Sequence, residues 1–227
     1  MDTPGNATYR GDLNNPLNHS QDIPVEQSTS VFVSGLPGNC RPTDLLAQIR
    51  GMGKLYASNM IAPADGYATA AAKLVFWDRA GLDNFWRKWE QDQFTVLGVK
   101  PRVVMNRFYT TSKPYSIASR ALTITGPSEV VNIFDLCFLF RGNFDFKLED
   151  MVESQHGHQS TVLVLFASYR SQASAAWKVV RQIQQGREVM KKPLTIHGED
   201  LEKIPLTPRE VNLWQHAVMT WAADPSQ

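Results

Sequence analysis

The chain has 227 residues, of which 43% are hydrophobic, and it carries a formal net charge of +1. This length allows one or two domains with cores of their own, and the near-neutral charge argues against a strong polyanion binder. No apolar run approaches the roughly 20 residues that a membrane-spanning helix needs. With two cysteines and no basic-then-apolar leader, we expect a nuclear or cytoplasmic protein that is not secreted.

Residues 1–27 are rich in Asn, Pro, Gly, Asp and Ser and show little apolar periodicity. Such a segment buries too little apolar surface to offset the entropy of ordering its chain. We therefore expect a disordered tail, followed by folded domains from residue 28.

Residues 28–112 predict a unit in the order strand, helix, strand, strand, helix, strand. Alternating β-branched and aromatic residues indicate the strands. Capping residues followed by apolar positions at helical spacing indicate the helices. We expect strands at 30–36, 55–61, 68–77 and 103–106, a first helix from Pro42 and a second after Asp78.

The same order returns in residues 119–204, after a polar linker at 113–118. Both units open with a short apolar strand that ends in Gly and Pro. In the second unit we expect strands at 121–125, 146–152, 161–167 and 194–197, and helices that begin near Ser128 and Ala173. Matching residues of the two second helices lie 91 positions apart: Arg79 and Arg170, Trp86 and Trp177.

The last segment, 205–227, predicts an amphipathic C-terminal helix. Thr207, Pro208 and Glu210 supply an N-cap, a proline at the first helical position and the glutamate of a capping box. The expected apolar stripe consists of Val211, Leu213, Trp214, Val218 and Trp221.

The element order defines an α+β fold, with two tandem β-α-β-β-α-β domains of the ferredoxin-like type, two four-stranded antiparallel sheets and a C-terminal helix. The first strand resembles the opening motif of the RNA recognition motif (RRM) family, which reads aliphatic, aromatic, aliphatic, any residue, Asn, Leu. Residues 31–34 and Leu36 fit this motif, and Gly35 replaces the Asn. The resemblance covers about 28–112 and 118–204 and implies two divergent RRM-type domains in tandem.

In the RRM family, aromatic side chains on the open sheet face stack RNA bases. Alternation directs Phe32 to this face. The family's second motif aligns with the third strand, 69–76, where Ala71 and Lys73 stand in place of two rings. The first unit therefore retains one stacking ring of the usual three.

The second unit departs further from the family pattern. Its first strand has Thr123 at the aromatic position, and its third strand directs Thr161, Leu163 and Leu165 outward. Neither register of that strand restores a ring. The resulting aliphatic face requires a cover, for which the C-terminal helix and a protein partner are the two alternatives.

Charge favours the first unit as the part that contacts phosphate. Residues 28–117 hold eleven Lys and Arg against six Asp and Glu, a net charge of +5, whereas residues 118–206 are neutral. The candidate RNA-binding residues are Phe32, Lys73, Arg102, Asn106 and Arg107. Arg102 and Asn106 have outward parity on the fourth strand.

Three classes of function fit this pattern. The first is an RNA-binding protein whose first domain binds single-stranded RNA weakly, in the 10⁻⁴–10⁻⁶ M range of sequence-independent binding. The second is a protein-interaction adaptor that docks a partner through the second domain. The third is a ferredoxin-like enzyme, which ranks last because the chain shows no catalytic set, metal-ligand cluster or cofactor motif.

Overall fold

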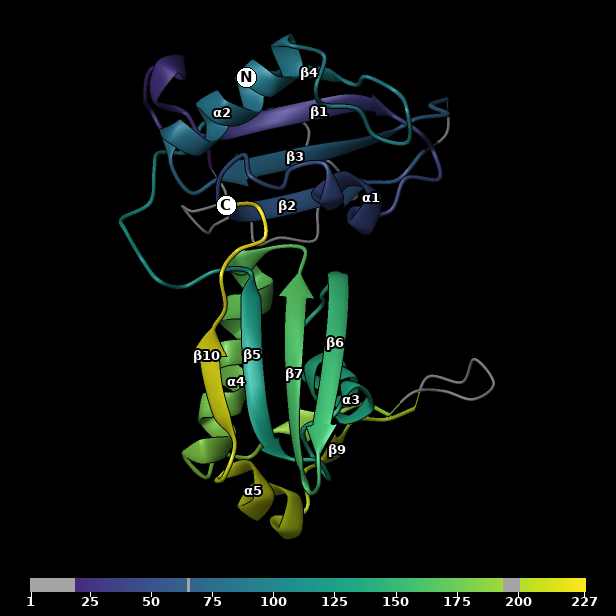
Figure 1. Ribbon diagram of the computed structural model, residues 1–227, viewed down its shortest axis with the longest axis vertical. Helices are drawn as coiled ribbons and strands as arrows, with labels where there is room; N and C mark the ends of the chain where they lie inside the picture. Colours follow the sequence, from purple (N-terminus) through teal and green to yellow (C-terminus); the bar gives the residue numbers. More distant parts are fainter. Residues whose placement is uncertain (1–18, 65, 194–200) are drawn as a thin grey trace.

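The protein is described by a computed structural model, which covers residues 19–64, 66–193 and 201–227 (Figure 1). Two four-stranded antiparallel sheets, each with helices on one face, stand one above the other. The predicted α+β class with two tandem domains is confirmed. A small two-stranded sheet completes the second domain.

The N-terminal domain has the strand order β2-β3-β1-β4. Its elements are β1 (Ser30–Leu36), α1 (Pro42–Ala47), β2 (Leu55–Ile61), β3 (Ala70–Phe76), α2 (Arg79–Glu90) and β4 (Arg102–Met105). Alternate residues of β1 and β3 join the apolar faces of both helices in one core. Because that core lies on one side of the sheet, the other face carries the remaining side chains of the strands.

Two short-range features explain where the helices of this domain begin. The carboxylate of Asp44 accepts the backbone N–H of Arg41 to complete a capping box around Pro42. Asp78 caps α2 by accepting the N–H of Gly81 at 2.8 Å. A side chain at Gly53 would meet the backbone of Gly81 at 2.3 Å, so this close approach requires glycine.

The C-terminal domain has the strand order β10-β5-β7-β6. Its elements are β5 (Ala121–Pro127), α3 (Ile133–Asn143), β6 (Leu148–His156), β7 (Gln159–Phe166), η3 (Tyr169–Ala173), α4 (Ser174–Gln184), β8 (Met190–Lys191), β9 (Ile204–Pro205), α5 (Pro208–Trp214) and β10 (Val218–Trp221). The first helix begins later than expected, because Asn132 rather than Ser128 is the N-cap.

The fourth strand of this domain is not the segment expected from the sequence. Residues 194–197 lie outside the described residues, and β10 occupies the sheet edge beside β5. The predicted C-terminal helix is therefore confirmed only over α5, and its extension through Trp221 is wrong. Pairing with β5 satisfies the backbone of β10, and Trp221 stacks on Trp177 with ring centres 4.5 Å apart.

Part of the expected disordered tail is ordered. Residues 19–27 include a short 3₁₀ helix, η2 (Val25–Gln27), and the N–H of Gln21 donates to the carbonyl of Tyr109 at 3.1 Å. Arg79 on α2 donates to the carbonyl of Glu26 at 2.5 Å. Hydrogen bonds to the folded domain therefore hold a segment whose own composition predicts disorder.

A buried ion cluster joins the two domains. Arg120, which is 0% exposed, contacts Glu149 at 2.5 Å and Asp224 at 3.1 Å. Arg50 of the N-terminal domain reaches Glu149 at 2.7 Å, and the N–H of Leu55 donates to Asp224 at 3.3 Å. The C-terminal segment thus bonds to both domains, and the cluster fixes how they sit on each other.

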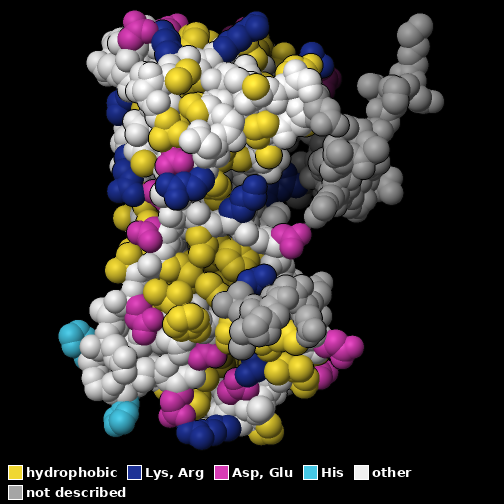
Figure 2. Space-filling model, turned by 90° about the vertical axis from the view of Figure 1, so that its right-hand side faces the viewer, with side chains coloured by type: hydrophobic (Ala, Val, Ile, Leu, Met, Phe, Trp, Pro, Cys, Tyr) yellow, Lys and Arg dark blue, Asp and Glu magenta, His cyan; other side chains and the backbone are white. Residues whose placement is uncertain are grey.

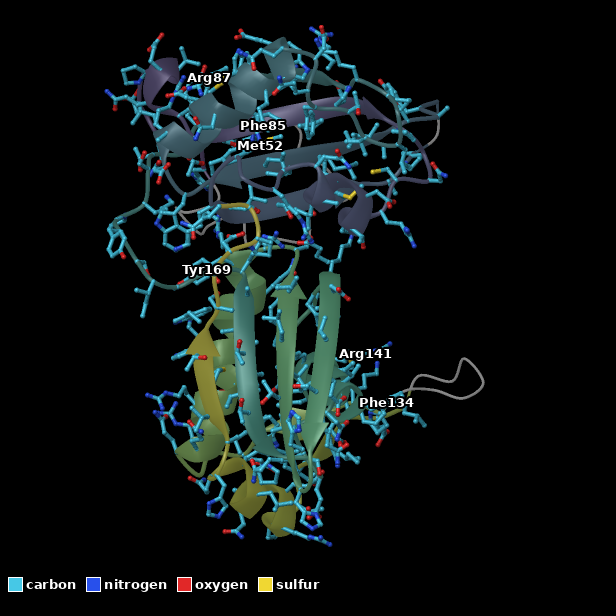
Figure 3. All side chains as sticks on the ribbon, in the orientation of Figure 1. Met52, Phe85, Arg87, Phe134, Arg141 and Tyr169 are labelled. Atoms are coloured by element: carbon cyan, nitrogen blue, oxygen red, sulfur yellow. The ribbon has the colours of Figure 1, made fainter. Side chains whose placement is uncertain are left out.

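Replacement of Arg120 should destabilise the folded protein strongly. Arg120→Met removes the buried cation that Glu149 and Asp224 share and leaves Glu149 with Arg50 alone, which costs about 3–5 kcal/mol. Urea denaturation should report this loss, with Arg87→Met as control, because Arg87 is exposed on α2 (Figure 3) and its loss should stay within about 0.5 kcal/mol. Equal stability of the two variants would contradict the structural role of the cluster.

Candidate nucleic-acid interface

The open face of the N-terminal sheet presents a row of residues centred on Phe32. In the strand register Phe32 lies opposite Lys73 on β3 and Val104 on β4, and Lys73 lies opposite Asn59 on β2. Val31 and Val33, the neighbours of Phe32, are 0% exposed in the core. Phe32 is half-buried, so part of its side chain remains accessible on this face.

A second row lies toward the end of β1. Ser34 is paired with Ala71 on β3 and with Arg102 on β4, and Ile61 on β2 continues the row. Arg102 is exposed, which supports its assignment as a candidate phosphate contact. This row adds a cation beside Phe32 but no second ring.

Asn106 does not belong to the accessible surface. Only 7% of it is exposed, and its side-chain amide donates to the Oγ atom of the fully buried Ser30 at 2.9 Å. The chain folds back over this end of the sheet, where the N–H of Thr29 donates to the carbonyl of Thr110 at 2.8 Å. The prediction that Asn106 is available to RNA is therefore wrong, because the segment that follows β4 covers it although its strand parity is outward.

Residues just after β4 add features that the sequence analysis missed. Phe108 is 50% exposed, and the Nζ atom of Lys73 lies 5.5 Å from the centre of its ring. Arg107, the preceding residue, is exposed as expected. Phe108 could have been found as an aromatic residue next to the candidate Arg107. It was missed because it lies beyond the fourth strand, where the family alignment was not applied.

Burial shifts the pKa of Lys73. The main cause of its lowered pKa is desolvation, and the charge of Arg170, from the C-terminal domain, lowers it further. Lys73 therefore lies under a partial cover and near a second cation.

Among the residues that the structure describes, the open face of the C-terminal sheet carries no aromatic ring. Thr123 on β5 lies opposite Leu163 on β7, and Leu163 lies opposite Val152 on β6. Val152 is 52% exposed. Trp214 of α5 is buried in the core on the opposite side of the sheet, so the expectation that the C-terminal helix covers this face is wrong.

The two open faces point in opposite directions. In Figure 1, α1 and α2 lie in front of the N-terminal sheet, whereas α3 and α4 lie behind the C-terminal sheet. Figure 2 shows Lys and Arg side chains gathered along the junction of the domains, above an apolar patch on the C-terminal domain. A strand of nucleic acid therefore cannot contact both open faces by lying between them.

Residues 19–64, 66–193 and 201–227 contain no group of three or more His, Cys, Asp or Glu side chains that could hold a metal ion. In the same ranges, none of the helices has the length and apolar character needed to cross a membrane. Burial raises the pKa of the thiols of Cys40 and Cys137, which opposes thiolate chemistry at neutral pH.

Comparison with known proteins finds similarity at the level of solved structures. No protein-family model matches the chain, and no curated protein matches it. The chain is similar to the first two RRM domains of the yeast poly(U)-binding protein Pub1, at 12% identity and a TM-score of 0.28, over 78% of this chain and 99% of that chain. It is similar to RNA recognition domains 1 and 2 of Sex-lethal from Drosophila melanogaster, at 16% identity and a TM-score of 0.28, over 68% and 92%.

A third similar structure holds the three N-terminal RNA-binding domains of the yeast splicing factor Prp24. The identity is 11% and the TM-score 0.32, over 86% of this chain and 64% of that chain. Likeness at these values does not establish what this chain binds. What this chain can bind therefore follows from its own side chains.

Removal of the Lys73 charge should stabilise the protein at neutral pH. A lysine whose pKa falls on folding costs stability while it is charged, and this cost is relieved as the pH rises from the folded-state pKa toward the ordinary value of 10.5. Lys73→Met should therefore raise the free energy of unfolding slightly at pH 7, and the gain should shrink by pH 10. Urea denaturation at both pH values measures it, and a loss at pH 7 would contradict the assigned environment.

Proposed function

We propose that this protein binds single-stranded RNA weakly through the open sheet face of its N-terminal domain. The observation that carries the proposal is the half-buried ring of Phe32, which has outward parity and lies opposite Lys73 in the strand register. A ring stacks on any base, and cations beside it contact the phosphates on either side of that base. Arg102 and Arg107 are the exposed cations assigned to this second role.

The strength of binding follows from the small number of contacts. Stacking contributes roughly 1–3 kcal/mol for each base, and this face offers Phe32, with Phe108 at its margin. Cations supply the rest of the affinity through a sequence-independent attraction that weakens with salt. We therefore expect dissociation constants in the range of about 10⁻⁴–10⁻⁶ M at physiological salt.

Loss of the Phe32 ring should weaken RNA binding without unfolding the protein. Phe32→Ala removes one stacking contact and should raise the dissociation constant roughly 5- to 150-fold. Fluorescence anisotropy with a random-sequence single-stranded RNA 12-mer measures the change. Phe32→Tyr keeps the ring and is the matched control, since its affinity should stay close to that of the natural chain.

Two results would contradict the proposal, one for the role of Phe32 and one for RNA binding as a whole. If Phe32→Ala and Phe32→Tyr bind RNA equally well while both variants melt at the temperature of the natural chain, the ring does not stack a base. If the natural chain shows no salt-dependent binding at all, the proposed function fails as a whole.

A protein-interaction adaptor is the second candidate, and the exposed aliphatic face of the C-terminal domain favours it. Val152 and Val218 are 52% and 61% exposed, and Leu163 lies between β5 and β6 on the same face. Apolar side chains gathered on one face are typical of surfaces that bind another protein. This role would use the C-terminal domain and leave the Phe32 face free.

A charged residue substituted into the aliphatic face would distinguish the adaptor role from RNA binding. Leu163→Asp should abolish recovery of a protein partner in a pull-down, because a carboxylate would lose its hydration in an apolar interface. Lys178→Asp, on the helical side of the same domain, should leave recovery unchanged. The adaptor role is contradicted if both variants recover the same proteins in the same amounts as the natural chain.

A further inference from the structure

A groove lies where α4 meets the start of β10 in the C-terminal domain. Its volume is about 270 Å³, and the residues that line it are Trp177, Arg181, Gln184, Ala217, Val218 and Met219. The three from α4 are spaced three or four positions apart, so they form one stripe along the helix. Small-molecule pockets typically measure about 300–1,000 Å³. This groove therefore suits one or two side chains of a larger ligand better than a whole small molecule.

Contacts between α4 and β10 hold the two walls of the groove in place. The side-chain amide of Gln184 donates to the carbonyl of Ala217 at 2.8 Å. Farther along the strand, Trp177 of α4 stacks on Trp221 of β10, with ring planes 10° apart. The groove is therefore formed before a ligand arrives, which lowers the entropic cost of binding.

The backbone of β10 is paired on one side only. β10 is the outer strand in the order β10-β5-β7-β6, and Figure 1 shows it at the edge of the sheet. The N–H of Ala222 donates to the carbonyl of Ala121, which makes these two residues a hydrogen-bonded pair of the ladder. Because such pairs alternate along antiparallel strands, the N–H and C=O groups of Met219 and Trp221 point away from β5.

These outward backbone groups leave room for a further strand. Outside the ladder with β5, the described residues make no hydrogen bond to the backbone of Met219 or Trp221. An unpaired edge of this kind is a template for another extended chain. The groove beside it receives the side chains that such a chain directs toward α4.

Arg181 gives the groove a positive charge. Its side chain is exposed, and its guanidinium donates to the Oε1 atom of Gln184 at 3.3 Å. Within the described part of the chain Arg181 forms no ion pair, and none of the residues that line the groove is acidic. The planar guanidinium matches the geometry of a carboxylate, so the groove favours an acidic ligand group.

We propose that an extended, acidic peptide segment of a partner protein adds to the C-terminal sheet beside β10. Its backbone bonds to Met219 and Trp221, and its carboxylate binds Arg181. Residues two positions apart in a strand face the same side, so an apolar residue two positions from the carboxylate contacts Trp177. Backbone bonds supply affinity in this mode of binding, and the groove supplies specificity. This peptide site is separate from the RNA-binding face of the N-terminal domain.

The experiment starts with selection from a phage-displayed library of random 12-residue peptides on the full chain. The enriched peptides should share an acidic and an apolar residue two positions apart. Fluorescence anisotropy then measures the affinity of an enriched peptide. Arg181→Gln should raise its dissociation constant about two- to fivefold, and Arg181→Glu by about tenfold or more, because like charges then meet.

The matched control makes the same change of charge elsewhere in the domain. Arg141 is exposed on α3, on the side of the domain away from β10 (Figure 3). Arg141→Glu should bind the peptide like the natural chain. Phe32→Ala should also leave peptide binding unchanged, so the outcome is independent of RNA binding.

Methyl groups on the peptide backbone test whether the peptide binds as a strand. Peptides N-methylated at one position at a time should lose affinity about two- to tenfold at every second position, where the N–H bonds to β10. The positions between should tolerate the methyl group. Losses without this alternation contradict strand addition.

The proposal is overturned if the selection enriches no peptide, or if the enriched peptide binds Arg181→Glu as tightly as the natural chain. Thermal melting of each variant controls for folding. If Arg181→Glu melts at a lower temperature than the natural chain, Arg181→Gln decides the outcome, and unchanged affinity of that variant equally rejects the site.

Discussion

The arrangement of the two domains depends on the buried ion pairs that the guanidinium of Arg120 makes with Glu149 and Asp224. A buried cation is tolerated only with partners, and here Glu149 and Asp224 provide them from β6 and from the C-terminal segment. Backbone bonds complete the junction, since the N–H of Gly53 donates to the carbonyl of Ser226 at 2.7 Å. Because each partner comes from a different part of the chain, the cluster forms only when the domains and the C-terminal segment meet in one geometry.

That geometry decides which surfaces can act together. The two open sheet faces point to opposite sides of the molecule, so one ligand cannot contact both by lying between them (Figure 1). The face with Phe32 lies on the side where η3 brings Arg170 toward Lys73. The aliphatic face around Leu163 therefore lies apart from the face that carries Phe32.

Local patterns predicted the parts of the interface that depend on alternation. Residues on either side of Phe32 are buried, so its outward direction follows from period two alone. The same reasoning failed for Asn106, which has outward parity but donates to Ser30 under the returning chain. Parity gives the face of a sheet on which a side chain lies, and a segment distant in sequence decides whether that place is open.

The amino-acid sequence by itself determined two β-α-β-β-α-β units, their core positions and the shortage of rings, because turn residues, caps and hydrophobic period act over a few neighbouring residues. Only the tertiary structure decided that β10 completes the second sheet and that residues 19–27 are held by the N-terminal domain. It also placed Arg170 of the C-terminal domain close enough to lower the pKa of Lys73 and of Lys113. These features depend on contacts between residues far apart in the chain, which no local pattern encodes.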